Sequence, residues 1–477
     1  MDEASTLRRT LSALRDARPA PADRDRVWSL AWPMILSNIS VPLLGLVDTA
    51  VLGHLPGPTY LAAVAVGTTL FGFLYWGFGF LRMGTTGLVA QRFGQPGSGA
   101  RDAALRLLLA QGGLLALAIG LAVIAASPLL LDLGIRLLAP PDAVGQEAIR
   151  YTSIRVFSAP AVLATYACTG FLVGMQDTRS VLLIMVTTNL INIALDLFLV
   201  LGLGMRTAGV AGATLASEYL GLLLAVGFSL RRLGAHPAVL DRAALLRPSA
   251  YAALIAVNGH LFLRTLCLLG AMSFFTAQGA RQGEVTLAAN ALLLSMLMLV
   301  AHGLDGFAHA AEALVGRSLG AGDRGALLRT IRATGAFSVL TALAFTALFA
   351  VAGPGFVSLL TDLPEVGDQA RHHLPWLVAL PLIAVWCFLL DGIFIGATRT
   401  RAMRDTMLIA TFGVFLPLWW VTRPLGNSGL WLSFDAFFLA RGAALGLRFL
   451  RTLPEWIPPR TGPADTVTRA AKGSAPV

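Results

Sequence analysis

Charged residues are scarce in this sequence. Of its 477 residues only 13% are Asp, Glu, Lys or Arg, whereas 56% are hydrophobic. Soluble domains carry about 25% charged residues. No polar segment between the apolar stretches is long enough to form a soluble domain of its own. The shortage of charge therefore excludes a large soluble core and predicts a polytopic protein that folds in the lipid bilayer.

Cysteine and the sequence motifs of enzymes are also scarce or missing. Cys168, Cys267 and Cys387 all fall inside apolar stretches without the spacing of metal ligands, so we interpret them as unpaired packing residues. The sequence has no HExxH, no Cys/His cluster, no GxSxG and no phosphate-binding loop. These absences argue against an integral-membrane enzyme, and we expect no catalytic residue and no cofactor. The first 26 residues are polar, so we expect the first helix to act as an uncleaved anchor.

The apolar stretches predict twelve membrane-spanning helices, each about 20 residues or longer. Gly, Pro and charged residues delimit them at residues 27–53, 60–86, 102–127, 145–173, 180–203, 208–230, 249–276, 285–313, 331–353, 371–397, 404–423 and 428–450. Such a chain has the lipid bilayer as its partner.

The loops between these spans alternate in charge, although the chain as a whole carries a net charge of +10. One set of loops, with both termini, holds 26 basic residues, and the other set holds six. The positive-inside rule places the first set and both termini in the cytoplasm. Basic residues distributed in this way serve topology, so we expect no nucleic-acid partner. The six outer residues are Arg136, Arg150, Arg206, Arg281, Arg371 and Arg423, and four more arginines, Arg82, Arg155, Arg264 and Arg441, lie within spans.

Two short motifs recur at nearly the same offset. The pattern Gly-x3-Gly-x3-Thr-Arg at 170–179 returns 222 residues later at 392–401, and 88–94 resembles 314–320, 226 residues later. Both offsets correspond to six spans, which predicts two six-helix lobes related by a pseudo-twofold axis along the membrane normal. A monomer is expected because one chain holds both lobes. The predicted divisions are a cytoplasmic tail (1–26), an N-lobe (27–232), a cytoplasmic linker (233–248), a C-lobe (249–450) and a cytoplasmic tail (451–477).

Polar residues of the N-lobe converge at one predicted depth. Asp48 lies near the outer end of span 1, and Asn192 and Asp196 lie one turn apart near the outer end of span 5. Thr214 enters span 6 from the same side, and Tyr151 opens span 4. A carboxylate within hydrocarbon costs about 2.5–3.5 kcal/mol unless it faces a cavity or a partner. We therefore expect these residues to form one site in the outer leaflet.

The segment WPMILSNISVPLLGLVDTAVLGHL, the Asn192-x3-Asp196 pair and LDGFAHAAEALVGRSLG at 304–320 resemble multidrug and toxic compound extrusion (MATE) transporters of the DinF-type branch. The resemblance covers about residues 27–450. It implies an N-lobe proton or cation site made by Asp48, Asn192, Asp196 and Thr214, with Tyr151 in the same cavity. The same four residues would be the ligands if the ion were sodium.

Two carboxylates in one pocket of low dielectric constant cannot both stay ionised without a counter-charge. Either one takes up a proton, or both bind a sodium ion. Pro33 interrupts the hydrogen bonds of span 1 and is the predicted hinge that this change of charge would bias. The alternative is that each polar residue merely bonds a neighbouring helix or, for Tyr151 and Thr214, its own backbone. Glu218, one turn beyond Thr214, fits either interpretation.

The C-lobe carries a different set of charges. Arg264 lies in the middle of span 7, Asp305 and Glu312 lie in span 8, and Asp391 lies in span 10. By resemblance, other branches of the family have a glutamate where this chain has Arg264, so a C-lobe sodium site is doubtful here. We expect instead a charge network of Arg264 with these acids, through Asp391 or Asp305. His302 and His309 fit either proton relays or packing, and Asp435 has no assigned role.

These residues predict a secondary antiporter that exports amphiphilic or cationic organic compounds in exchange for protons, or alternatively sodium, across a bacterial inner membrane. Its substrate cavity would lie between the lobes, lined by aromatic and methionine side chains. The candidates for this lining are Phe71, Tyr75, Trp76, Met272, Phe274, Phe275, Met296 and Met298. The alternative is a flippase or exporter of lipid-linked precursors or specific metabolites from the same superfamily. A passive channel is disfavoured, because the acids are dispersed and do not form rings.

Overall fold

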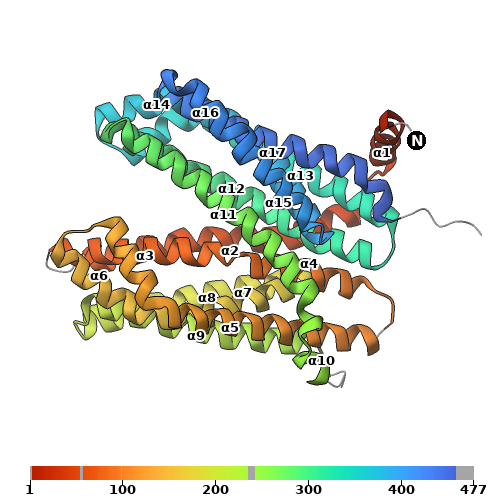
Figure 1. Cartoon of the computed structure of the whole chain (residues 1–477), viewed down its shortest axis with the longest axis horizontal. Coiled ribbons are helices and arrows are strands. Elements are labelled where there is room, and N and C mark those ends of the chain that lie inside the picture. Colours follow the sequence, from red (N-terminus) through yellow and green to blue (C-terminus); the bar gives the residue numbers. More distant parts are fainter. Residues whose placement is uncertain (1–2, 54–56, 98, 235–241, 458–477) are drawn as a thin grey trace, which may run out of the picture.

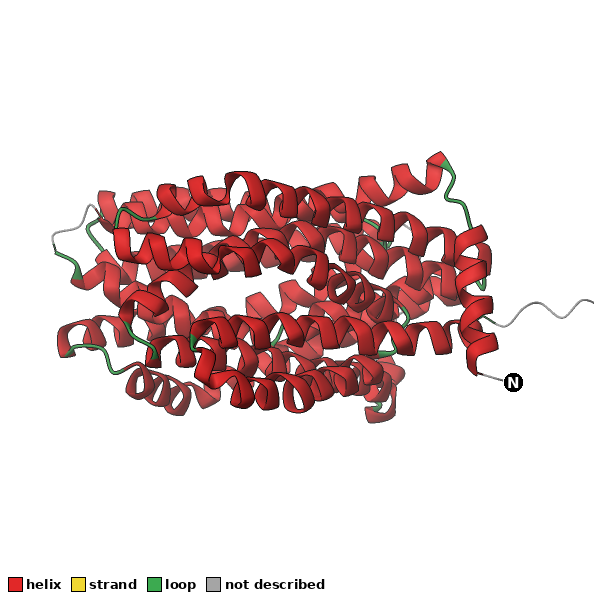
Figure 2. Ribbon diagram, turned by 90° about the horizontal axis from the view of Figure 1, so that it is seen from above, coloured by secondary structure: helices red, strands yellow, loops and turns green. Residues whose placement is uncertain are grey.

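The computed structural model describes residues 3–53, 57–97, 99–234 and 242–457, and within these ranges the chain is helical and has no strand. Eleven helical segments in the described ranges are long and apolar enough to cross a membrane. The 33-residue helix α2 (Pro21–Gly53) contains the first predicted span and brings the number of spans to twelve. Figure 2 shows that most helices run along one common direction. The predicted all-α membrane fold is confirmed.

The N-lobe is the lower group of helices in Figure 1. Besides α2, it contains α3 (Thr59–Gly77), α4 (Phe80–Gly94), α5 (Gly99–Leu138), α6 (Asp142–Arg155), α7 (Ala159–Gly174), α8 (Thr178–Asp196) and α9 (Arg206–Arg232). A short helix, α10 (Arg242–Leu246), and the 3₁₀ turn η3 (Pro248–Tyr251) lead to the second lobe.

The C-lobe is the upper group of helices in Figure 1. It contains α11 (Ala252–Arg281), α12 (Glu284–Gly320), α13 (Arg324–Leu360), α14 (Pro364–Gly396), α15 (Thr400–Leu408), α16 (Leu416–Thr422) and α17 (Asn427–Trp456). The π-helical segment η4 (Ile409–Phe415) joins α15 to α16, and the 3₁₀ turn η5 (Arg423–Leu425) follows α16. The N-terminal helix α1 (Glu3–Asp16) packs on α17 and α13.

Two spans of the N-lobe are interrupted within the membrane. The second span breaks at residues 78 and 79, between α3 and α4. The fourth span passes through the 3₁₀ turn η1 (Val156–Ser158) before α7 begins. Pro160, the second residue of α7, explains this break, because proline has no N–H to continue the hydrogen bonds of α6.

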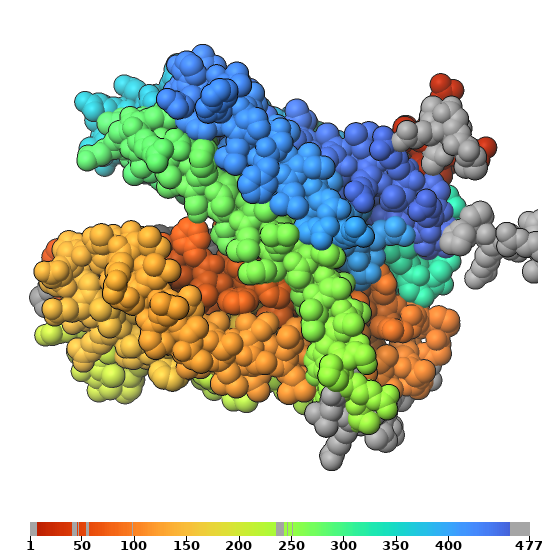
Figure 3. Space-filling model, in the orientation of Figure 1, coloured from red at the N-terminus to blue at the C-terminus, as the bar shows by residue number. Residues whose placement is uncertain are grey.

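The lobes join at one end of the molecule and separate at the other. Two buried hydrophobic clusters contain side chains of both lobes, and they include Leu81 with Ile393 and Met34 with Phe307. Two other clusters belong to one lobe each, around Tyr151 in the N-lobe and Trp431 in the C-lobe. Figure 3 shows the hollow between the lobes at the end away from α1 and α10. The molecule therefore has a cleft that is closed at the end where α1 and α10 lie.

The two copies of one sequence repeat pack against each other at the closed end. A Cβ atom built on Gly320 of α12 would lie 2.8 Å from the carbonyl carbon of Gln91 on α4. A Cβ atom built on Gly94 of α4 would lie 2.8 Å from the carbonyl carbon of Arg317 on α12. The offset of 226 residues that relates Gly94 to Gly320 also relates Gln91 to Arg317. The contact is therefore reciprocal, as expected where a pseudo-twofold axis passes between α4 and α12.

Several elements extend beyond their predicted bounds. The second span, predicted to end at residue 86, continues as α4 to Gly94, and the eighth, predicted to end at 313, continues as α12 to Gly320. Helix α1 and the start of α2 fall within the predicted tail 1–26, and α17 continues past residue 450 to Trp456. The reason is that backbone hydrogen bonds do not stop where side chains become polar, so hydropathy underestimates the length of each helix.

Replacing Gly320 with valine should weaken the joined end of the lobes. The added side chain has no space beside the Gln91 backbone, and overpacking of this kind costs about 1–3 kcal/mol. We expect Gly320→Val to lower the melting temperature of the purified protein in detergent. Gly227→Val on α9 is the matched control, because a Cβ at Gly227 meets no atom within 4 Å. Equal melting temperatures for the two variants would contradict this packing.

Candidate functional site

The structure brings together four of the residues predicted for the N-lobe site. Asp48 is on α2, Asn192 and Asp196 are on α8, and Thr214 is on α9. Helix α8 packs against both α2 and α9, which places the three segments side by side. Asp196 and Asn192 are buried, and Asp48 is half-buried. The carboxyl groups of Asp48 and Asp196 lie within hydrogen-bonding distance of each other.

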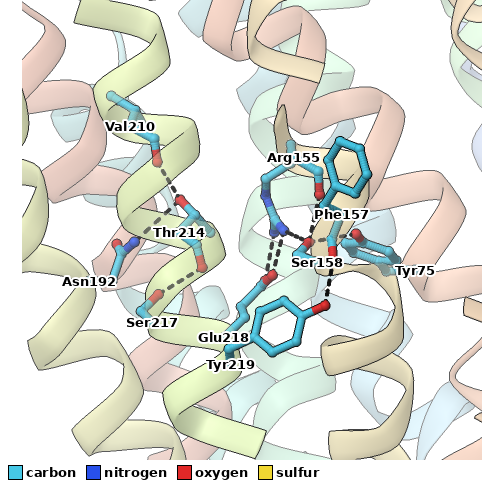
Figure 4. Close-up of polar contacts among 10 residues, drawn as sticks. All are labelled: Tyr75, Arg155, Phe157, Ser158, Asn192, Val210, Thr214, Ser217, Glu218 and Tyr219. Atoms are coloured by element: carbon cyan, nitrogen blue, oxygen red, sulfur yellow. Dashed lines mark hydrogen bonds and ion pairs between the residues drawn. The ribbon is translucent and has the colours of Figure 1, made fainter. Parts of the chain in front are cut away.

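The Asn192 amide connects this carboxyl pair to α9. In the orientation that satisfies both of its neighbours, its nitrogen donates to Asp196 Oδ2 over 3.0 Å. Its oxygen then accepts from Thr214, with the hydroxyl at 3.3 Å and the backbone N–H at 3.2 Å. The Thr214 hydroxyl also lies 2.9 Å from the carbonyl oxygen of Val210, as Figure 4 shows. Thr214 thus contacts both Asn192 and the backbone of its own helix.

The carboxyl pair retains unused hydrogen-bonding capacity. Oδ1 of Asp48 and Oδ1 of Asp196 are buried, and neither has a donor in the described part of the chain. An ionised carboxylate only accepts hydrogen bonds, so two adjacent carboxylates need a proton on one of them or a cation between them. Asp196 is followed directly by the π-helical segment η2 (Leu197–Gly202), a kind of local irregularity that often marks functional sites.

Tyr151 lies beside this pair but belongs to a separate small pocket. It is buried and lies within hydrogen-bonding distance of Thr68 and Arg155, with Asp48 within electrostatic range. The pocket has a volume of about 280 Å³. It is lined by Thr68, Phe71, Gly72, Tyr75, Trp76, Tyr151, Arg155 and Tyr166. Three of the aromatic residues predicted to line the substrate cavity, Phe71, Tyr75 and Trp76, therefore line this pocket of the N-lobe together with Arg155.

An ion pair between Arg155 and Glu218 dominates this pocket and was not predicted from the sequence. The two side chains make a bidentate contact, with N–O distances of 2.5 and 2.7 Å. Arg155 also donates to the Ser158 hydroxyl, which lies 2.9 Å from the hydroxyl of Tyr75 (Figure 4). The available signal was that Arg155 in span 4 and Glu218 in span 6 carry opposite charges near the same predicted depth. Glu218 thus has a charged partner, whereas Asp48 and Asp196 have each other.

Glu312 lies at the junction of the lobes, away from the Arg264 network in which it was predicted. It forms an ion pair of 3.3 Å with Arg82 on α4, and its other oxygen lies 3.2 Å from Nδ1 of His309. Asp305, which was grouped with Arg264 too, lies within electrostatic range of His309 and Arg82. The reason is that α12 lies between the lobes and turns this face toward α4. The Arg82–Glu312 pair therefore bridges the N-lobe and the C-lobe.

Arg264 pairs with Asp391, one of the two acids considered for it. A second guanidinium, that of Arg441 on α17, lies 2.7 Å from the same Oδ2 atom. All three side chains are buried, and Arg441 also lies over the rings of Phe437 and Phe438. Two arginines on one aspartate give this cluster a net positive charge. Such a charge opposes cation binding at Asp391.

Two other predicted cavity residues are core residues. Phe275 and Met296 are buried in the hydrophobic cluster of the C-lobe, with Phe275 against the rings of Trp431 and Phe434. The sequence pattern could not separate a cleft-facing aromatic residue from one that packs inside its own lobe.

Replacing Arg82 with glutamine should loosen the closed end of the cleft. Glu312 would lose its guanidinium partner and retain only His309, so we expect a bias of about 1–2 kcal/mol toward an arrangement in which this end separates. Spin labels at Gln95 and Gly322, at the ends of α4 and α12, would report a longer distance by electron paramagnetic resonance. Arg101→Gln is the control, because the ion pair that Arg101 forms in the described part of the chain is with its sequence neighbour Asp102 and does not bridge the lobes. Identical distance distributions in all three proteins would contradict the prediction.

Comparisons with known proteins agree with this architecture. The MatE family model matches residues 33–198 and 261–421. The chain is 42% identical over 423 residues to DNA damage-inducible protein F of Escherichia coli K12, covering 88% of this chain and 90% of that protein. It is 27% identical over 483 residues to the probable multidrug resistance protein NorM of Pseudomonas aeruginosa, covering 95% of this chain and 93% of that protein.

Solved structures share the fold. A transporter of the MOP superfamily from Pyrococcus furiosus superposes with a TM-score of 0.79 at 21% identity, covering 91% of this chain and 96% of that chain. A multidrug resistance MATE family transporter in an outward-facing conformation gives 0.79 at 20% identity, covering 91% and 97%. The twelve helices in two lobes, the paired acids in the N-lobe and the family match over most of the sequence lead to one conclusion: this chain belongs to the MatE family of multidrug and toxic compound extrusion transporters.

Proposed function

We propose that this membrane transporter is a secondary antiporter that exports amphiphilic or cationic organic compounds and is driven by protons entering through Asp48 and Asp196. The observation that supports this most is the contact of these two carboxyl groups, whose Oδ1 atoms have no donor in the described part of the chain. A pair of this kind holds one more proton when it is closed off from water than when it is hydrated. Uptake and release of that proton would couple the ion to the substrate.

Sodium is the alternative coupling ion. The oxygens of Asp48, Asp196, Asn192 and Thr214 would be its ligands, and a hard cation of this kind prefers oxygen. Asn192 would then turn its oxygen toward the ion, which removes its hydrogen bond to Asp196.

Helix α2 is the element through which the site would move the lobes. It carries Asp48 near one end, and along its length it packs against α8 of the N-lobe and against α12 and α13 of the C-lobe. Pro33 lies in the part of α2 that contacts α12, where Ala31 and Ile35 face Gly306, and its missing N–H leaves one carbonyl of the helix without its usual donor. The Asn38 amide reaches the His302 carbonyl on α12, with a distance of 3.4 Å. A change of charge at Asp48 can thus alter the bend of a helix that contacts both lobes.

The proposed orientation is supported by the charges of the loops, and the proposed substrate class is supported by the relatives. By the positive-inside rule, the closed end with α1 and α10 faces the cytoplasm, so the cleft opens outward in the inner membrane of a bacterium. The NorM relative is named as a probable multidrug resistance protein. The lipid-linked precursor alternative receives less support, because Arg82 and Arg155 are each paired with an acid and are not free to bind pyrophosphate. The chain is expected to act as a monomer without a cofactor.

Transport in proteoliposomes tests this proposal. Purified protein is reconstituted, and movement of ethidium is followed by fluorescence while a pH gradient and a sodium gradient are imposed separately. Ethidium movement driven by the pH gradient alone is the expected result. Movement that requires the sodium gradient would replace the proton by sodium at the same site. Movement of ethidium that is independent of both gradients would overturn the antiport mechanism.

A further inference from the structure

A second polar cavity lies at the outer end of the C-lobe, between α11 and α16, far from the residues of the coupling site. Its volume is about 610 Å³. It is lined by Phe274, Gln278, Arg281, Gln282, Leu416, Trp419, Trp420, Arg423 and Gly426. Arg281 ends α11 and Arg423 begins η5, so both guanidinium groups lie where two membrane spans reach the surface. Apart from Phe274, which the sequence predicts as a candidate for lining the substrate cavity, no residue of the proposed transport mechanism lines this cavity.

The charged residues of the cavity are both arginines, and both lack partners. Arg281 and Arg423 are exposed, and neither guanidinium group forms an ion pair or a hydrogen bond within the described ranges. The other four arginines of the outer loops are engaged. The contacts are Arg136 with Asp132, Arg150 with Glu147, Arg371 with Asp368, and Arg206 over the ring of Tyr60. The two outer arginines without partners thus lie in the same cavity.

The remaining polar groups of the cavity are also suited to an anion. Nε2 of Gln282 is buried, and it has no acceptor in the described part of the chain. No carboxylate lines the cavity. Guanidinium groups bind phosphate oxygens in a bidentate manner, and an amide N–H can add a further donor. Phe274, Leu416 and the largely buried Trp419 supply an apolar wall next to these donors.

We propose that this cavity binds the phosphate-bearing headgroup of an anionic membrane lipid, with an acyl chain against its apolar wall. A free inorganic anion would use the guanidinium groups but would leave the aromatic wall without a partner. The exposed Trp420 at the rim is the residue type that anchors proteins at the headgroup level. Arginines close to anionic lipids attract them by about 1 kcal/mol each. The bound lipid would connect α11 to α16 at the mouth of the cleft. This inference does not depend on the identity of the coupling ion.

Native mass spectrometry of the full-length protein in detergent tests the proposal. The protein is titrated with phosphatidylglycerol, with phosphatidylcholine and with inorganic phosphate. We expect phosphatidylglycerol to bind the wild type at least about tenfold more tightly than it binds the R281Q/R423Q variant. The matched control is R136Q/R371Q, which removes two arginines of the same outer set that already have acidic partners. R281K/R423K, which conserves the charge, should retain binding and shows that the fold is not the cause of a loss.

Two results would overturn the proposal. One is equal binding of phosphatidylglycerol to the wild type and to R281Q/R423Q, which would place lipid contacts elsewhere. The other is binding of inorganic phosphate that displaces phosphatidylglycerol at the same concentration, which would identify a free anion as the ligand. Preference for phosphatidylglycerol over phosphatidylcholine, lost only in R281Q/R423Q, would support it.

Discussion

In Asp48→Asn, a pH gradient should no longer drive accumulation of the substrate. The substrate concentration ratio should then equal that of a protein in which transport is not coupled to protons. Two pH units supply about 2.7 kcal/mol per proton, which sustains a concentration ratio of about 100 for a neutral exchange of one proton for one cation. Asparagine cannot carry the proton, and it gives Asp196 a neutral donor in place of an acidic partner. We therefore expect the ethidium ratio in proteoliposomes to fall from about 100 toward 1.

The controls for this prediction separate charge from structure. Asp48→Glu keeps the carboxyl group and should retain part of the coupling. Asp132→Asn removes an exposed acid that pairs with Arg136, and we expect no change in transport. Asp196→Asn should match Asp48→Asn, because the proton belongs to the pair and not to one residue. If Asp48→Asn transported as well as the wild type while Asp196→Asn did not, the shared site would be wrong.

Asp391→Asn should cause the largest loss of stability in the C-lobe. Asp391 is the acidic partner of both Arg264 and Arg441, and all three side chains are buried. Removal of one member of a buried ionic cluster typically costs about 3–5 kcal/mol, because the remaining charge stays in a medium of low dielectric constant. Here two guanidinium groups would lose the same counter-charge. The melting temperature in detergent, followed by circular dichroism, should drop clearly below that of the wild type.

A triple variant makes this prediction specific. Buried ion clusters that are replaced by apolar residues of similar size are often as stable as the original. We therefore expect R264M/D391L/R441M to recover most of the stability that Asp391→Asn loses. Asp405→Asn is the control for loss of a carboxylate that is half-exposed and pairs with Arg404. A melting temperature for Asp391→Asn equal to that of Asp405→Asn would contradict the role of the cluster.

The positions of the spans and of the N-lobe acids could be predicted from the sequence because both are local properties. An apolar segment of sufficient length forms a spanning helix in lipid whatever its neighbours are, since its backbone must satisfy its own hydrogen bonds. Asp48 and Asp196 are conspicuous in such segments because burial of a carboxylate in hydrocarbon is costly. Their depths along two helices can be counted from the helix ends, so their meeting at one level was predictable.

The pairing of the arginines with the acids could not be predicted in the same way. Glu312 and Asp305 are seven residues apart on one helix, yet Glu312 contacts Arg82 of the other lobe, 230 residues away in the chain. Arg441 joins Arg264 at Asp391, and Arg155 joins Glu218, through contacts between helices. Such contacts depend on the rotation of each helix about its axis and on the angle at which two helices cross, and neither quantity is encoded in a local pattern.

The sequence by itself determined the twelve spans, the two lobes and the acidic residues of the proposed coupling site, because hydropathy, repeats and buried charge are properties of single segments. Only the tertiary structure decided that α12 turns Glu312 toward the N-lobe and that Arg281 and Arg423 meet at one cavity. It also decided that one end of the cleft is closed by the reciprocal contact of α4 and α12. These features depend on which surfaces of distant helices face each other, and that choice is made by the packing of the whole chain.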